Sequence, residues 1–250
     1  MSGSRDDGGR RRGAKARAAS RPSGRGLKVR VRTGKGRSVS STRWLERQLN
    51  DPYVAEAQAR GYRSRAAFKL LQLDDRFGFL KSARRVVDLG AAPGGWLQVA
   101  RQRCRPEAVI VGIDLQPVQA VADALVIEGD FLDEAAQAQL SDALGGPADL
   151  VLSDMAAPAT GHTKTDHLRV MALVEEAADF AERTLAPGGT FVAKVLQGGT
   201  EHELLARLKR RFAKIHHAKP EASRSGSAEM YLVATGYRGP EADPATSGAP

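Results

Sequence analysis

A lysine interrupts an apolar segment in the last quarter of this 250-residue chain. The segment GTFVAKVLQGG, residues 189–199, has the composition of a buried strand, and Lys194 lies among its apolar residues. An ammonium group is costly to bury unless an opposite charge pairs with it or it loses its proton. A lysine held in such a place can move protons in a reaction. The alternative is that Lys194 lies at a strand end, where its charge reaches water.

Four aspartates stand in the same kind of position as Lys194. Each comes at or near the end of a short apolar run, and the runs are RRVVDLG, EAVIVGIDL, DALVIEGD, ADLVLSDM and GGTFVAKV. The polar residues near their ends are Asp88, Asp114, Asp130, Asp154 and Lys194. One polar strand end is common, but five in register indicate a binding edge.

Helical stretches separate several of these runs, for example HLRVMALVEEAADFAERTL. Continuous apolar strands separated by helices predict a parallel sheet covered on both faces. Two further runs, in KRRFAKIHHAKP and EMYLVATGY, predict a hairpin or an antiparallel edge. The sequence therefore predicts an α/β domain with a mostly parallel seven-stranded sheet. In such sheets ligands bind beyond the carboxyl ends of the strands.

The segment DLGAAPGGW follows the first run and opens a helix. Its glycines let the backbone approach a ligand, but Ala92 replaces the second glycine of the dinucleotide pattern G-x-G-x-x-G. Asp114 is placed to accept hydrogen bonds from ribose hydroxyls, and Asp130 to reach an adenine amino group. Carboxylates around the pocket, with Asp88 at the first strand, suit a positively charged ligand. S-adenosylmethionine fits this description better than NAD. The plainer interpretation of Asp88 is a loop or helix-start carboxylate.

A set of alternating charges is expected beside this pocket. Asp154 and Lys194 end the fourth and fifth strands, which lie close together in sheets of this type. Lys69 lies in the predicted helix SRAAFKLLQLDDRF, and Glu229 begins the last strand. Two lysines and two carboxylates lower the cost of burying one another, and can make a lysine basic near neutral pH. The plainer alternatives are a solvated helix face for Lys69 and an edge-strand charge for Glu229.

Charge and composition divide the chain into three parts. Residues 1–40 carry 13 Lys and Arg against 2 acidic residues, whereas residues 86–200 carry a net charge of −9. We expect a disordered basic arm over 1–40, one domain over 41–237 and a disordered tail over 238–250. Basic flanks favour a polyanion such as RNA as partner, and a transit peptide is the competing interpretation of the arm. The single cysteine, Cys104, fits a reducing compartment, which we take to be the cytoplasm, and no membrane span is expected.

Several motifs, in order, resemble the FtsJ/RrmJ family of ribose 2′-O-methyltransferases over about residues 43–236. They are SRAAFKL, VVDLGAAPGGW, GIDL, EGDF, LSDMAAPATGH, FVAKV and SAEMYLVA. The resemblance implies a Rossmann-like class I methyltransferase fold that uses S-adenosylmethionine. It is closest to the bacterial enzyme of ribosome biogenesis that methylates a uridine of 23S rRNA in the large ribosomal subunit.

The same resemblance implies roles for individual residues. The implied catalytic set is Lys69, Asp154, Lys194 and Glu229. The implied S-adenosylmethionine contacts are Gly94, Trp96, Asp114, Asp130 and Asp154. Trp96 also has a core interpretation, because it begins the helix after the glycine loop. No metal is expected, and nothing demands more than a monomer.

Other functions compete with this interpretation. The motifs are shared with enzymes that act on tRNA or an mRNA cap, and a non-catalytic ribosome assembly factor can keep such a fold. The glycine pattern disfavours a NAD-dependent oxidoreductase. The place after the fourth strand reads D-M-A-A-P, which disfavours amino-group methylation, and Cys104 lies away from the strand ends. For RNA binding we expect the basic segment 43–70, with its aromatic residues Trp44, Tyr53, Tyr62 and Phe68 available for stacking or the core.

Overall fold

The computed structural model describes residues 45–46, 48–158, 160–197 and 202–240. The predicted arm over 1–40 and all but the first three residues of the predicted tail lie outside this part of the chain, as does Trp44. The boundaries of the three predicted regions therefore stay predictions.

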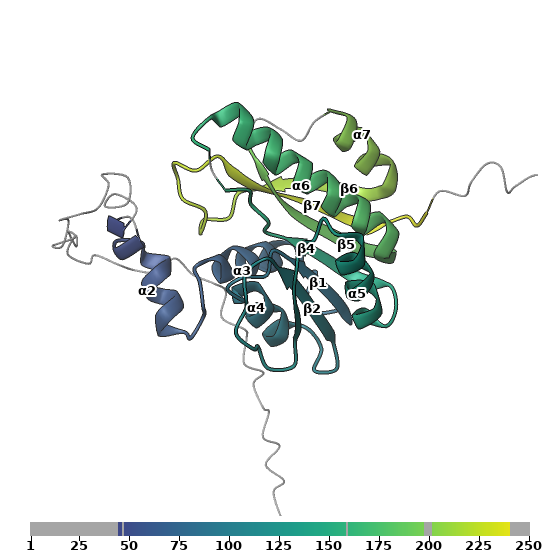
Figure 1. The fold of residues 1–250 in the computed structure, drawn as a ribbon, viewed down its shortest axis with the longest axis horizontal. Helices are drawn as coiled ribbons and strands as arrows, with labels where there is room; N and C mark the ends of the chain where they lie inside the picture. Colours follow the sequence, from purple (N-terminus) through teal and green to yellow (C-terminus); the bar gives the residue numbers. More distant parts are fainter. Residues whose placement is uncertain (1–44, 47, 159, 198–201, 241–250) are drawn as a thin grey trace, which may run out of the picture.

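One seven-stranded sheet forms the centre of the described chain (Figure 1). Its strand order is β3-β2-β1-β4-β5-β7-β6, with β7 antiparallel to both β5 and β6 and all other pairs parallel. The strands are β1 (Arg85–Leu89), β2 (Val109–Asp114), β3 (Leu125–Glu128), β4 (Ala148–Ser153), β5 (Leu185–Leu196), β6 (Phe212–Ala218) and β7 (Glu229–Tyr237). The mostly parallel α/β sheet expected from the sequence is confirmed.

Helices cover both faces of the sheet. They are α2 (Pro52–Ala59), α3 (Ala66–Phe77), α4 (Gly95–Arg103), α5 (Glu134–Leu144), α6 (Thr163–Thr184) and α7 (His202–Arg211). One apolar core joins α2, α3 and α4 to the sheet, and a second joins α5, α6 and α7 to the opposite face. Neighbouring residues of one strand serve different cores, since Val86 belongs to the first and Val87 to the second.

Local sequence signals set the ends of the helices that position the site. Asp51 caps α2, where its Oδ1 accepts a hydrogen bond from the Tyr53 amide at 3.1 Å, and Pro52 opens the helix. Helix α3 ends at Phe77, and Gly78 caps it with a left-handed φ of +69°. Helix α3 packs in the first core, and Lys69 lies in its first turns.

Two boundaries differ from the sequence prediction. The basic run KRR of residues 209–211 ends helix α7, so β6 begins only at Phe212. Strand β3 ends at Glu128, two residues before Asp130.

The predicted last pair of strands is antiparallel as expected, but β7 lies inside the sheet, between β5 and β6. This insertion brings the start of β7 beside the carboxyl end of β5, where Glu229 pairs with Leu196.

Candidate active site

The loop between β1 and α4 is shaped by its glycines. Gly90 has φ +80°, and a Cβ there would lie 2.9 Å from the Cγ of Met155. Gly94 has φ +104° and precedes the first residue of α4. Asp114, at the end of β2, holds the loop because its Oδ2 accepts a hydrogen bond from the Ala92 amide at 2.9 Å. A side chain at either glycine would collide with neighbouring atoms, since a Cβ at Gly94 would lie 2.6 Å from an Arg63 guanidinium nitrogen.

A pocket of about 630 Å³ opens beyond the carboxyl ends of β1, β2, β3 and β4. Among its lining residues are four that sequence reasoning singled out, namely Gly90, Asp114, Asp130 and Asp154. Apolar residues that the sequence analysis did not identify complete the walls, including Leu115, Phe131, Leu132 and Met155. Their signal was available, since each of them lies within two residues after one of the predicted polar strand ends.

Two of the predicted cofactor contacts do not line this pocket. Gly94 shapes the loop instead, and the Trp96 side chain is buried in the first core. The Trp96 indole nitrogen donates a hydrogen bond to the Ala66 carbonyl at 2.9 Å, and its ring lies 5.8 Å from that of Tyr231. Only the backbone of Trp96, in the first turn of α4, is left to meet a ligand, because first-turn N–H groups lack helical acceptors.

The four residues of the predicted catalytic set come together as two ion pairs. The Lys69 Nζ lies 2.7 Å from the Glu229 Oε2, and the Lys194 Nζ lies 3.2 Å from the Asp154 Oδ1. All four side chains are at most 17% exposed, so water screens these charges weakly. Lys194 also donates a hydrogen bond to the Asp154 backbone carbonyl at 2.5 Å. The apolar surroundings of Lys194 are thus compatible with its charge because the charge is paired.

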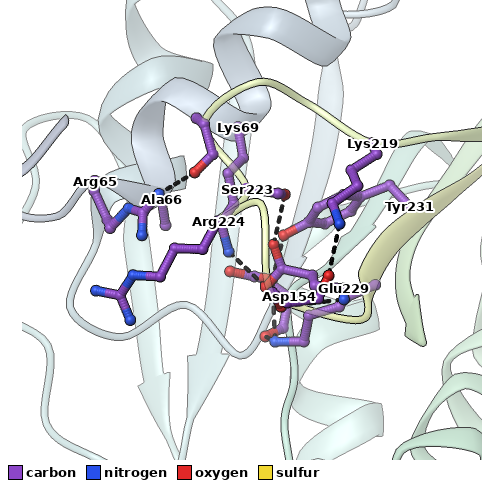
Figure 2. A network of polar contacts seen from close by, with 12 residues as sticks. Arg65, Ala66, Lys69, Asp154, Lys219, Ser223, Arg224, Glu229 and Tyr231 are labelled. Carbon is purple, nitrogen blue, oxygen red and sulfur yellow. Dashed lines mark hydrogen bonds and ion pairs between the residues drawn. The ribbon is translucent and has the colours of Figure 1, made fainter. Parts of the chain in front are cut away.

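Tyr231 links the two ion pairs. Its hydroxyl donates a hydrogen bond to the Asp154 Oδ1 at 2.8 Å, and the Lys69 Nζ lies 5.8 Å from its ring centroid. Figure 2 shows Tyr231 gathered with Lys69, Asp154 and Glu229 where α3 meets the sheet. Sequence reasoning missed Tyr231, although it stands two residues after Glu229 on the same face of β7.

The pKa values in this cluster follow from burial and neighbouring charge. Burial alone would raise the pKa of Asp154, but Lys194 and Lys69 outweigh it and hold that pKa below its ordinary value. Burial raises the pKa of Tyr231 well above its ordinary value, and the Asp154 and Glu229 carboxylates raise it further. Asp154 is therefore an anion over the physiological range, while Tyr231 stays a protonated donor.

Asp88 behaves differently from Asp154. It is buried in β1, and neither of its carboxylate oxygens has a hydrogen-bond partner among the described residues. Burial raises its pKa well above the ordinary value, and the nearby charges of Asp154 and Asp114 raise it further. Asp88 does not line the pocket, although it lies two residues before Gly90. The raised pKa of Asp88 therefore favours the protonated, neutral form of its carboxyl group.

Arg63 is another residue that the sequence analysis did not single out. Its guanidinium donates hydrogen bonds to the carbonyls of Pro93, Gln119 and Ala120, at 3.2, 2.5 and 2.6 Å. It joins the glycine loop to the segment after β2. Arg63 lies in the basic segment 43–70, and nothing in the sequence distinguished it from the other arginines there as the residue that joins these two loops.

The aromatic residues of the basic segment 43–70 are mostly part of the fold. Tyr53 and Phe68 are buried, with ring centroids 5.4 Å apart, so neither ring is available to stack on a base. The possible stacking role of Tyr53 is therefore wrong, and the core interpretation of Phe68 is confirmed. Tyr62 is half-buried, and its hydroxyl hydrogen-bonds the Gln102 side chain at 2.6 Å.

The residues that line the pocket suit S-adenosylmethionine. Asp114 and Asp130 lie where carboxylates can accept from a nucleoside, the apolar wall can flank a purine, and Asp154 supplies negative charge for a sulfonium. No described residues form a cluster of three or more His, Cys, Asp or Glu able to hold a metal. No helix among residues 45–240, outside the gaps given above, is both long and apolar enough for a membrane span. The fold and this pocket define a class I S-adenosylmethionine-dependent methyltransferase.

Comparison with known proteins identifies the family within this class. The model of the FtsJ-like methyltransferase family matches residues 62–237. A ribosomal RNA large subunit methyltransferase E of Rhizorhabdus wittichii is 60% identical over 220 residues, which is 88% of this chain and 96% of the relative. The protein of the same name from Rhodospirillum rubrum is 58% identical over 242 residues, covering 93% and 92% of the two chains. The chain belongs to the FtsJ-like methyltransferase family.

A solved structure supports the same assignment of the fold. It is a Plasmodium falciparum protein designated a ribosomal RNA methyltransferase, 31% identical to this chain with a TM-score of 0.64. The match covers 72% of this chain and 100% of that one. The Rossmann-like class I methyltransferase fold and the family expected from the sequence motifs are thereby confirmed.

Proposed function

We propose that this protein transfers the methyl group of S-adenosylmethionine to the 2′-oxygen of a uridine ribose in 23S rRNA. The observation that carries this proposal is the buried set of Lys69, Asp154, Lys194 and Glu229, whose member Asp154 also lines the pocket. The large-subunit rRNA substrate is supported by the relatives, which are 55–61% identical and share one designation.

The proposed mechanism divides the work among the four charged residues. S-adenosylmethionine, when bound, supplies an electrophilic methyl group. Lys194 acts in its neutral amine form, in which it accepts the proton of the 2′-hydroxyl and becomes an ammonium group paired with Asp154. The hydroxyl is otherwise a poor nucleophile. Asp154 orients Lys194 through their 3.2 Å contact and keeps its negative charge at the pocket. Glu229 holds Lys69, so that Lys69 and Lys194 flank the ribose site.

The proposed working unit is a monomer, since every member of the charged set comes from one chain. Its partner is the large ribosomal subunit, approached through the basic residues that flank the acidic centre of the sequence. Because ribosomes are assembled there, we place this activity in the bacterial cytoplasm.

The experiment that tests this function maps a methyl group. The purified protein is incubated with isotopically labelled S-adenosylmethionine and large subunits or bare 23S rRNA from cells that lack the corresponding activity. We expect label on one uridine, at a position that resists alkaline hydrolysis because its 2′-oxygen is blocked. Label on a base, on tRNA alone or on no RNA would contradict the proposal, and the last result would favour a non-catalytic assembly factor.

A further inference from the structure

Two side chains contact the Glu229 carboxylate, Lys69 and Ser223. The proposed mechanism gives no role to Ser223. While Lys69 contacts the Oε2, the Ser223 hydroxyl donates a hydrogen bond to the Oε1 at 2.8 Å. Ser223 is 6% exposed, so this bond is shielded from water. It lies in the loop of residues 219–228 between β6 and β7, and Figure 2 shows it close above Glu229.

The loop that carries Ser223 is hydrogen-bonded to α3 and to the residue before it. The Ala222 amide donates a hydrogen bond to the Gln72 Oε1 at 2.8 Å, and the Ala222 carbonyl accepts one from the Arg65 guanidinium. Gln72 lies within α3, and Arg65 immediately precedes it. Since Ser223 follows Ala222 directly, its position is set by the helix that also carries Lys69.

Other residues of the loop make further contacts, both within the loop and to its surroundings. The Lys219 Nζ donates a hydrogen bond to the Ser227 carbonyl at 2.6 Å, and the Ser227 hydroxyl accepts one from the Glu229 amide at 3.1 Å. The Arg224 Nε lies 3.3 Å from the Asp51 Oδ2, which also contacts Arg65. A loop held by this many contacts has little freedom, so the buried Ser223 presents its hydroxyl from a rigid frame.

The two contacts on Glu229 together fix its carboxylate. A single partner leaves a carboxylate free to rotate, because its terminal torsion is broad. Donors on both oxygens remove that freedom, and hydrogen bonds to an ionised group are stronger than neutral ones. The charge of Glu229 is thereby aimed at Lys69.

We propose that Ser223 is a positioning residue for methyl transfer, which orients the Glu229 carboxylate so that Lys69 is held beside the reacting ribose. This inference rests on the proposed function, and it assigns to Ser223 no contact with substrate or donor. Loss of the hydroxyl should lower kcat and leave the affinity for S-adenosylmethionine unchanged, because Ser223 does not line the pocket.

The test compares Ser223→Ala and Ser223→Thr with Ser225→Ala, each in the full chain. Ser225 lies in the same loop with an exposed side chain, so Ser225→Ala is a matched control for the same chemical change. We expect Ser223→Ala to lower kcat on large subunits about tenfold, as fits the loss of one hydrogen bond to a charged group. Ser223→Thr should restore most of the rate, and Ser225→Ala should match the unchanged protein.

A double-mutant cycle separates orientation of Glu229 from a structural role. If Ser223 acts through Glu229, Ser223→Ala should cause no further loss of kcat in a Glu229→Ala background. A further tenfold loss in that background, or a normal kcat for Ser223→Ala alone, would overturn the proposal. Calorimetric titration of S-adenosylmethionine should give the same dissociation constant for all folded variants.

A crystal structure of the Ser223→Ala variant keeps this inference separate from the proposed function. We expect the Glu229 carboxylate to be rotated or disordered there, relative to the unchanged protein. An unchanged carboxylate would overturn the positioning role whatever the substrate. If the unchanged protein methylated no rRNA, the proposed function would fail, while the two crystal structures would still decide whether Ser223 orients Glu229.

Discussion

At the scale of single residues, the cost of burying charge organises this site. Lys194 and Lys69 are each paired with a carboxylate, and removing one partner would leave an uncompensated buried charge. Asp154 lies between the two lysines and beside the pocket, so the same negative charge serves the lysines and suits a cationic donor. In the proposed mechanism, proton transfer and donor binding are thus coupled through one side chain.

Asp88 provides a prediction about pH and stability. Its pKa is raised by folding, so the folded protein binds a proton that the unfolded chain has already lost in the same pH range. The stability that it contributes is therefore present at low pH and falls as pH rises above its ordinary pKa. We expect Asp88→Asn to raise the midpoint of thermal unfolding relative to the unchanged protein, by a difference that grows as the pH rises above the ordinary pKa of an aspartate, in melts taken from about pH 4 to about pH 8.

Thermal melts of the two proteins across that range, without ligand, measure this difference. Asp142→Asn is a matched control, because Asp142 is exposed on α5. A difference in melting temperature that stays constant with pH would show that Asp88 is ionised in the folded protein.

The sequence predicted the residues whose roles follow from strand position. Asp114, Asp130 and Asp154 lie at the pocket because carboxyl ends of parallel strands share one edge. Tyr231 and Ser223 were not predicted, since a tyrosine on a strand and a serine in a loop are common in any fold. Their roles depend on contacts across 77 and 6 residues of sequence, respectively, which no local pattern encodes.

At the scale of elements, the packing of α4 against α3 supports the glycine loop. Trp96 connects the two helices, since its indole nitrogen bonds the Ala66 carbonyl. We expect Trp96→Ala to lower the free energy of unfolding by about 3–5 kcal/mol, as for other large core aromatics. Trp96→Phe keeps most of the packing but loses the hydrogen bond, so about 1–2 kcal/mol is expected.

Urea denaturation followed by circular dichroism measures both variants. Titration of S-adenosylmethionine into folded Trp96→Phe should give an affinity within about twofold of the unchanged protein, because the indole does not line the pocket. A loss of more than about tenfold in the affinity of that folded variant would show that the indole itself contacts the donor.

Element boundaries were predicted less well than element types. The basic residues at positions 209–211 end α7 rather than begin a strand, because the helix can bury Leu204 and Leu208 on one face and keep its charges in water. The place of β7 between β5 and β6 was not predicted either. Hydrophobic pattern identifies a strand, but strand order depends on long-range pairing.

At the scale of the whole molecule, charge is segregated along the chain. Residues 1–40 have a net charge of +11, and residues 86–200, which supply much of the pocket, have −9. We expect rRNA binding to weaken on the order of 10³-fold between about 50 and 200 mM salt, since it rests on phosphate contacts. Affinity for S-adenosylmethionine should change little, because a pocket largely shields its contacts from salt.

Deletion of residues 1–40 tests where the RNA contacts lie. Filter-binding measurements over the same salt range should show a shallower slope for this variant. Deletion of residues 241–250, which carry a net charge of −2, is the control and should leave the slope unchanged. An unaltered slope without the arm would place the phosphate contacts in the domain instead.

One measurement tests the central claim most directly, namely that the paired lysines and carboxylates activate a ribose hydroxyl. Lys194→Ala is assayed for transfer of labelled methyl groups to large subunits, and its dissociation constant for S-adenosylmethionine is measured alongside by calorimetry. We expect transfer to fall below detection while the dissociation constant stays within about threefold of the unchanged protein, since Lys194 does not line the pocket. Near-normal turnover by this variant would contradict the account.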